Sequence, residues 1–130
     1  MTVKEALTLC DDLKPNSYET ATKVRWLSEI EMLIRDEIFA SHVPSDISAG
    51  QAVLPLDDRT PMDTPLAVPT PYDGVYPYYL HMMIDRSNGD VTHYDRSAAA
   101  FAAAFNSFAA YYNRTVLPLQ SGQQITLLRR

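Results

Sequence analysis

Hydrophobic positions in the first third of the chain recur with helical spacing and predict two helices. The first begins at Thr2, whose hydroxyl can form a capping box with Glu5, and it ends before Pro15. The second runs from Ser17, as N-cap, to about Ser41. Its apolar stripe contains Val24, Trp26, Leu27, Ile30, Leu33, Ile34 and Ile38. The charged residues expected mostly on its opposite side are Glu29, Glu31, Arg35, Asp36 and Glu37.

A third helix is predicted to begin with another capping box, formed by Thr70 and Asp73, with Pro71 in the first helical position. Pro77 then leaves two alternatives, because a proline inside a helix removes one hydrogen bond and clashes with the preceding turn. Either the helix kinks at Pro77, or it begins properly only near Tyr76.

Asn88-Gly89 ends the third helix, and Asp90 caps a fourth that runs to about Asn113. So short a connection requires the two helices to form an antiparallel hairpin. One stripe of the fourth helix carries Tyr94, Ala98, Phe101, Phe105, Phe108 and Tyr112. The alanines that flank this stripe are Ala99, Ala100, Ala102, Ala103, Ala104, Ala109 and Ala110. A helix with so little charge through its centre requires a cover, from this chain or from a neighbouring subunit.

Residues 43–69 contain five prolines and are predicted to form a long loop without a helix. Its apolar residues can pair as short strands or dock in a neighbour's groove; they include Leu54, Leu56, Leu66 and Val68. Residues 116–130 are predicted to form an extended C-terminal arm. Its candidate contact residues are Leu117, Leu119, Ile125, Leu127, Arg129 and Arg130.

These patterns predict a single all-α domain over residues 1–130, a small four-helix bundle with the long Pro-rich loop between its second and third helices. A chain of 130 residues is long enough for one core and too short for two ordinary domains. No apolar run approaches the roughly 20 residues that span a bilayer, and the N-terminus lacks the layout of a signal peptide. We therefore expect synthesis in the cytoplasm and no membrane partner.

The net charge of −5 disfavours a dedicated DNA-binding domain, because affinity for nucleic acid comes mainly from Lys and Arg on phosphates. Cys10, beside Asp11, is expected to be a small buried hydrophobe rather than a reactive thiol. His81 and His93 match no zinc site. The acidic residues of the loop lack the order of a calcium loop, and no phosphate cradle or activated nucleophile is evident. We expect no metal, no cofactor and no catalytic residue.

Tyrosine is the remaining distinctive residue, with eight in the chain. Its apolar ring and polar tip suit both a core and a protein interface. Helical position favours the core for Tyr76, Tyr79, Tyr94 and Tyr112. It favours an interface for Tyr72, Tyr78 and Tyr111.

The chain contains the strings Pro71-Tyr72-Asp73-x-x-Tyr76-x-x-Tyr79-Leu80, Ile84-Asp85, Asn88-Gly89, Tyr94-x-x-Ser97-x-x-x-Phe101 and Tyr111-Tyr112-Asn113-Arg114-Thr115. Together these strings resemble a family of small tailed-phage and prophage proteins. This family comprises the head–tail connector proteins, also called adaptor or head-completion proteins. The resemblance covers most of the chain, matches least over residues 43–69, and departs from the family at Pro77 and Asp95-Arg96.

The resemblance implies a structural virion protein of the neck, without enzymatic activity. Such subunits assemble as a ring, commonly a dodecamer, beneath the portal protein. The ring extends the DNA channel, seals the filled head and docks the tail or a stopper protein, so it serves genome packaging and ejection. DNA would only pass through the lumen, without sequence-specific binding, and an acidic lumen suits this passage.

Two other functional classes make different predictions. A small helical packaging or regulatory factor, similar to a terminase small subunit, predicts salt-sensitive DNA binding. An enzyme that uses the region of His81 and His93 predicts bound metal. Neither class has a sequence feature in its favour as specific as the resemblance to connector proteins.

Overall fold

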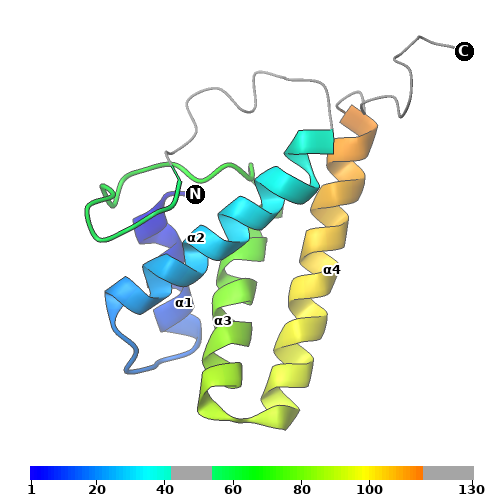
Figure 1. Cartoon of the computed structure of the whole chain (residues 1–130). Coiled ribbons are helices and arrows are strands. Elements are labelled where there is room, and N and C mark those ends of the chain that lie inside the picture. The colour runs from blue at the N-terminus through cyan, green and yellow to red at the C-terminus, as the bar shows by residue number, and fades with distance from the viewer. Residues whose placement is uncertain (42–53, 116–130) are drawn as a thin grey trace, which may run out of the picture.

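The described part of the chain is all-α, as predicted from the sequence. A computed structural model describes residues 1–41 and 54–115 (Figure 1). Four helices pack together: α1 (Val3–Leu13), α2 (Thr20–Glu37), α3 (Val75–Asn88) and α4 (Val91–Thr115). Two short 3-10 helices, η1 (Phe39–Ser41) and η3 (Tyr72–Gly74), follow α2 and precede α3.

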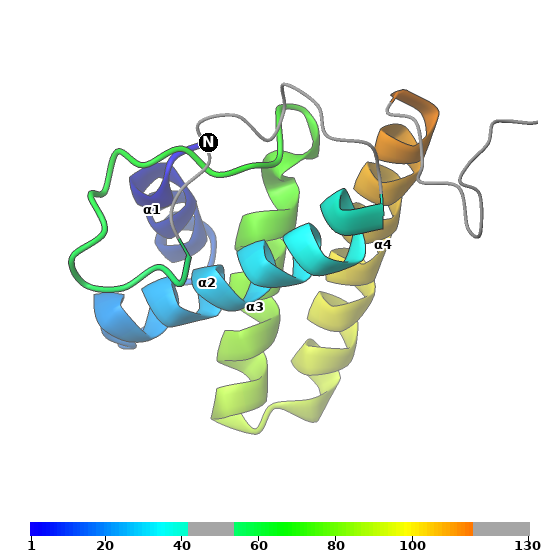
Figure 2. The ribbon, with the colours of Figure 1, turned by 45° about the horizontal axis from the view of Figure 1, so that its top comes forward.

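Helix α3 lies at the centre of the bundle and contacts each of the other three helices. It forms an antiparallel hairpin with α4, while α2 crosses α3 obliquely and α1 packs at the side away from α4 (Figures 1 and 2). The apolar stripe of α2 faces inward, with Leu27, Ile30 and Ile34 fully buried. The predicted amphipathic character of this helix is therefore confirmed.

The capping box of α1 is present as predicted. The Thr2 backbone N–H donates to the Glu5 carboxylate (2.8 Å), and the Glu5 N–H donates to the Thr2 hydroxyl (3.2 Å). Two further N–H groups of the first turn, those of Val3 and Lys4, donate to loop carbonyls at residues 64 and 62. The loop thus completes the cap of α1, because the first-turn N–H groups of a helix have no partner within it.

Two predicted helix starts need correction. Helix α2 begins at Thr20 rather than after Ser17, because the Asn16 side chain accepts the Tyr18 N–H (3.1 Å) and holds this stretch in a turn. The capping box at Thr70 does not form, because its hydroxyl donates to the Asp73 carboxylate (2.9 Å) and the 3-10 helix η3 intervenes.

Helix α3 begins at Val75, so of the two alternatives for Pro77 the structure has the second, a helix that begins near Tyr76. Pro77 is the third residue of the helix, where a backbone N–H would have no helical partner, so the proline removes no hydrogen bond. At the other end Gly89 adopts a left-handed conformation (φ 71°), which suits glycine. Asp90 then caps α4 by accepting the His93 N–H (3.1 Å), as predicted.

Residues 54–71, named the strap here, cross α1 and α2 and lie partly in the core. Leu56, Leu66 and Val68 are buried within this chain, so their assignment to a neighbour's groove needs correction. Leu54 is half-buried against the same core. Instead of short strands, the described part of the loop forms one isolated bridge between Thr2 and Pro65. The side chains of Leu56, Leu66 and Val68 pack into the same hydrophobic core as residues of α1, α2 and α3.

Candidate functional site: an assembly surface

The predicted aromatic stripe of α4 faces the bundle, and its C-terminal half is the better covered. Phe108 and Tyr112 are buried, while the other four positions, including Phe101 and Phe105, are half-buried. Phe39 of η1 packs on Tyr112 (ring centroids 4.9 Å apart) and on Phe108 (6.2 Å). This aromatic joint fastens the end of α2 to the end of α4.

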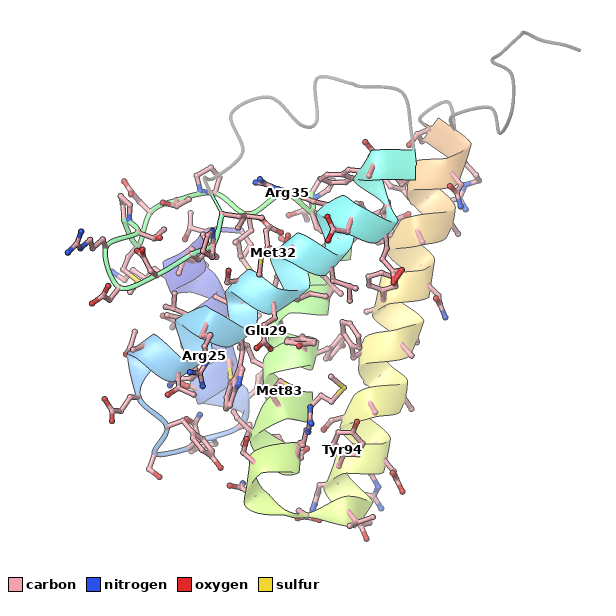
Figure 3. The ribbon with its side chains drawn as sticks, viewed as in Figure 1. Arg25, Glu29, Met32, Arg35, Met83 and Tyr94 are labelled. Carbon is pink, nitrogen blue, oxygen red and sulfur yellow. The ribbon has the colours of Figure 1, made fainter. Side chains whose placement is uncertain are left out.

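Near the hairpin the stripe is covered less completely. Phe101 packs edge-on against Tyr79 of α3 (5.2 Å), whose hydroxyl donates to Glu29 of α2 (3.0 Å). Figure 3 shows Met83 and Tyr94 lying between α3 and α4, and both are half-buried. The core predicted for Tyr76 and Tyr112 is confirmed, whereas Tyr79 and Tyr94 lie at its margin.

The opposite side of α4 forms an exposed surface, named the α4 outer face. Its exposed residues, most of them three or four positions apart, are Ala99, Ala102, Ala103, Asn106, Ala110 and Asn113. No charged residue occurs from Ser97 to Asn113. Because α4 stands at the edge of the bundle, this face has no cover within the described part of the chain (Figures 1 and 2).

The three tyrosines assigned to an interface differ in their surroundings. Tyr72 stacks on Tyr111 with ring centroids 4.6 Å apart, and both are half-buried. Tyr78 is 42% exposed and is available to a partner. The stacked pair joins η3 to the last turns of α4, so these two tyrosines already stabilise the subunit itself.

Glu31 lies at the centre of a buried polar network that the sequence analysis missed. It is fully buried, accepts the Tyr76 hydroxyl (2.6 Å) and accepts the Ala67 N–H (2.9 Å). The Tyr76 hydroxyl in turn accepts the Val68 N–H (2.9 Å). Glu31 follows Leu27 by four residues and precedes Ile34 by three, so its spacing already placed it on the buried stripe.

The network holds the strap in place and perturbs the titration of its members. Burial raises the pKa of the Glu31 carboxyl above its ordinary 4.5, although the hydrogen bond from Tyr76 acts in the opposite direction. Burial also raises the pKa of Tyr76 well above its ordinary 10.0. Besides the hydrogen bonds from the Ala67 and Val68 N–H groups, the strap is held by the Leu56 N–H, which donates to the buried Ser28 hydroxyl (2.9 Å).

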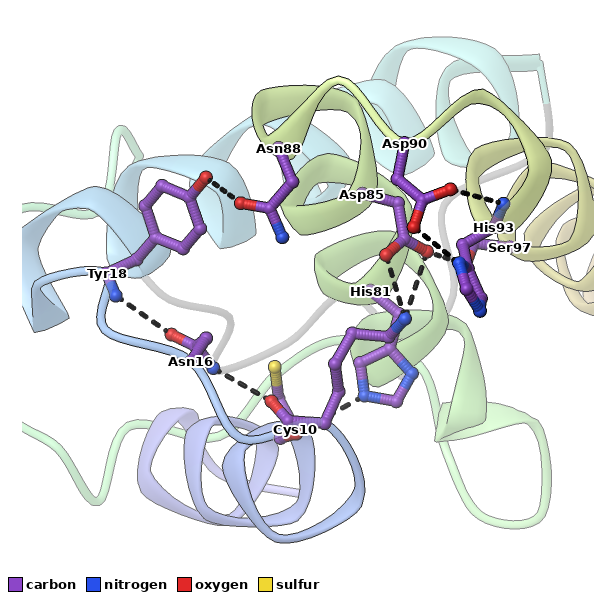
Figure 4. Close-up of polar contacts among 10 residues, drawn as sticks. Cys10, Asn16, Tyr18, His81, Asp85, Asn88, Asp90, His93 and Ser97 are labelled. Carbon is purple, nitrogen blue, oxygen red and sulfur yellow. Dashed lines mark hydrogen bonds and ion pairs between the residues drawn. The ribbon is translucent and has the colours of Figure 1, made fainter.

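A second polar cluster joins α1 to the α3–α4 hairpin (Figure 4). Lys14 donates to both carboxylate oxygens of the buried Asp85 (2.8 and 3.0 Å), and the Ser97 hydroxyl also donates to Asp85. The ring of His81 lies 3.3 Å from the Cys10 carbonyl oxygen. Ser97 is hydrogen-bonded to the carboxylate that Lys14 also binds, so the cluster connects the end of α1 with α3 and α4.

Burial shifts the pKa of two groups that the sequence offered for chemistry, Cys10 and His81. Burial raises the pKa of the Cys10 thiol to about 11, and Cys10 is fully buried as predicted. Burial also lowers the pKa of His81 below its ordinary 6.5. His93 is paired with Asp90 on the surface. In residues 1–41 and 54–115, no three His, Cys, Asp or Glu side chains gather closely enough to hold a metal ion.

Two shallow hollows open on the described surface. One, of about 660 Å³, lies between α1 and η3 and is lined by Met1, Lys4, Glu5, Thr8, Leu9, Asp12, Thr70 and Asp73. The other, of about 520 Å³, lies at the α3–α4 turn and is lined by Asp85, Arg86, Gly89, Asp90, Val91 and Tyr94. At the edge of the first hollow the Thr70 hydroxyl donates to the Asp73 carboxylate (2.9 Å).

The remaining predicted contact residues lie outside the described residues. They are Leu117, Leu119, Ile125, Leu127, Arg129 and Arg130. Residues 43–53 of the predicted loop are also outside. No helix within the described ranges combines the length and hydropathy that crossing a bilayer requires.

Comparison of the chain with known protein families, with curated proteins and with solved structures finds no match.

Proposed function

We propose that this chain is a subunit of a phage or prophage head–tail connector. In this role it forms a ring beneath the portal protein, extends the DNA channel and offers a docking surface to the tail or a stopper protein. The proposal draws on the strings that resemble this family, from Pro71 to Thr115, and on the all-α fold. The work of such a protein is done by its interfaces, with no catalytic residue.

The α4 outer face is the observation that carries the proposal. Small residues at Ala99, Ala102, Ala103 and Ala110 allow another helix to approach closely, at the short end of the usual 8–10 Å between helix axes. The absence of charge from Ser97 to Asn113 means that a partner can cover this face without leaving a charge unpaired. We assign this face to the contact between neighbouring subunits.

The rest of the surface is compatible with this role. A net charge of −5 suits a lumen through which DNA slides without binding. The exposed Tyr78 ring remains available for a neighbouring protein. Leu56, Leu66 and Val68 are occupied in the core, so residues 116–130 remain the candidate arm toward the portal protein or a neighbour.

Replacement of Ala103 by glutamate tests the subunit contact. Ala103 is exposed, so the variant should fold with unchanged helical content by circular dichroism. Its assembly on the portal ring of the same phage should weaken by more than about tenfold, because a buried unpaired carboxylate costs more than about 1.4 kcal/mol. Native mass spectrometry of the variant mixed with portal rings measures the number of bound subunits.

Ala21→Glu is the matched control, since Ala21 is also an exposed helical alanine but lies in the first turn of α2. A carboxylate is favourable near the start of a helix, so this control should fold and assemble like the unmodified chain. Equal assembly by the two variants would exclude the α4 outer face as the subunit contact.

A further inference from the structure

The hollow between α1 and η3 combines an apolar floor with an acidic rim. Leu9 lines it and is 37% exposed, and Leu13, one turn further along α1, is 63% exposed. The two leucines are four residues apart, so they lie on one face of α1.

The rim carries more negative than positive charge. Three acidic side chains, Glu5, Asp12 and Asp73, line the hollow, together with two cations, Lys4 and the Met1 amino group. Asp73 is 3.6 Å from the Met1 amino group. Hydrogen bonds from Thr2, first from its backbone N–H, lower the pKa of Glu5 and keep it ionised near neutral pH. An occupant of this hollow should therefore be apolar and basic.

The hollow lies close to the point where the described part of α4 ends. Tyr72 of η3 stacks on Tyr111 of α4 (4.6 Å), and the next residue, Asp73, lines the hollow. Thr115 is one helical turn beyond Tyr111, and its hydroxyl donates to the Tyr111 carbonyl (2.9 Å). The described part of α4 therefore ends one helical turn beyond its contact with η3.

We propose that residues 125–130 of the same chain dock in this hollow. The sequence there is Ile-Thr-Leu-Leu-Arg-Arg, which supplies apolar side chains for Leu9 and two cations for the acidic rim. Asp12 is exposed next to Leu9 and lies at the rim where an arginine can pair with it. In this arrangement the C-terminal segment covers the exposed leucines of α1 in the free subunit.

The chain between Thr115 and Ile125 is long enough for this contact. Residues 116–124 number nine and span up to about 30 Å when extended, at roughly 3.3 Å per residue. The path needs only to cross η3, which contacts α4 directly. This inference concerns a contact within one chain and does not depend on the proposed ring.

Disulfide trapping in the full-length chain tests the contact. One variant carries Thr8→Cys in the hollow with Leu128→Cys, and the control carries Ser87→Cys at the α3–α4 turn with Leu128→Cys. Both new helical positions are exposed, and Cys10 stays in place because burial raises its thiol pKa to about 11. Non-reducing gels after mild oxidation then compare the rates of intramolecular bond formation.

Docking predicts that the Thr8→Cys variant closes its disulfide within the monomer at least about tenfold faster than the Ser87→Cys control, because docking raises the local concentration of the two thiols. Adding Arg129→Glu and Arg130→Glu should remove most of this advantage. Equal rates for the two cysteine pairs, disulfide-linked dimers as the main product, or an advantage that survives the charge reversal would each overturn the proposal.

Discussion

Replacing Phe108 with alanine is expected to lower the free energy of unfolding by about 4 kcal/mol, the range for a fully buried phenylalanine. Phe108 contacts Phe39, Tyr72 and Tyr112, so its removal leaves a cavity where η1, η3 and α4 meet. The loss combines the transfer free energy of the ring with the cost of this cavity. Urea unfolding followed by circular dichroism measures it.

Phe105→Ala is the control for this prediction, since Phe105 lies on the same stripe but is only half-buried. Its loss should be about half as large, because less apolar area is returned to water. Equal losses for the two variants would contradict the view that the aromatic joint around Phe108 is the principal anchor of α4.

Replacing Glu31 with alanine is expected to cost about 2–3 kcal/mol of unfolding free energy. The variant leaves the Ala67 N–H and the Tyr76 hydroxyl without their acceptor in the core. Each buried group without a partner costs about 1–3 kcal/mol, and relief of the desolvated carboxylate offsets part of this sum. The loss should appear first as faster amide exchange in the strap, which native-state hydrogen exchange measures residue by residue.

Glu31→Gln removes the ionisable carboxyl and keeps one of the two oxygens that accept the Tyr76 hydroxyl and the Ala67 N–H. The folded state raises the pKa of Glu31 above 4.5, so it binds this proton more tightly than the unfolded chain does. The resulting stability is fully present below pH 4.5 and is lost as the pH rises through the folded pKa. The stability of the unmodified chain relative to Glu31→Gln should therefore increase as the pH falls toward 4.5. A constant difference between the two chains across this window would contradict the assigned pKa shift.

The helices were predictable because their signals are local. Each of these signals depends on residues within a few positions of one another. They are the apolar stripe of α2, the helix caps at Thr2 and Asp90, and the helix end at Asn88-Gly89. The hairpin of α3 and α4 followed from the short connection between them. These elements fix the fold class and place the α4 outer face opposite the aromatic stripe.

The position of the strap and the hydrogen-bond partners of Glu31 were not predictable from local patterns. Glu31 is charged, so it was expected mostly with the polar side of α2, yet its partners Ala67 and Tyr76 are 36 and 45 residues away. The same distance in sequence concealed the burial of Leu66 and Val68 in the loop. Prolines correctly excluded a helix from this segment, but they gave no information on which surface it covers.

The tyrosines predicted to lie at an interface show the same difference between local signals and tertiary contacts. Tyr78 was predictable as exposed from its helical position, and the structure leaves it so. Tyr72 and Tyr111 were also placed away from the core stripe, but their pairing depends on the 3-10 helix η3, which no pattern indicated. The contact between η3 and α4 is therefore a result of the tertiary structure alone.

The proposed connector role is tested most directly by electron microscopy of the unmodified chain mixed with the portal ring of the same phage. The proposal predicts an added ring of subunits on one face of the portal, with α4 outer faces at the contacts between subunits. Portal rings that remain bare at saturating concentrations of the folded chain would contradict it.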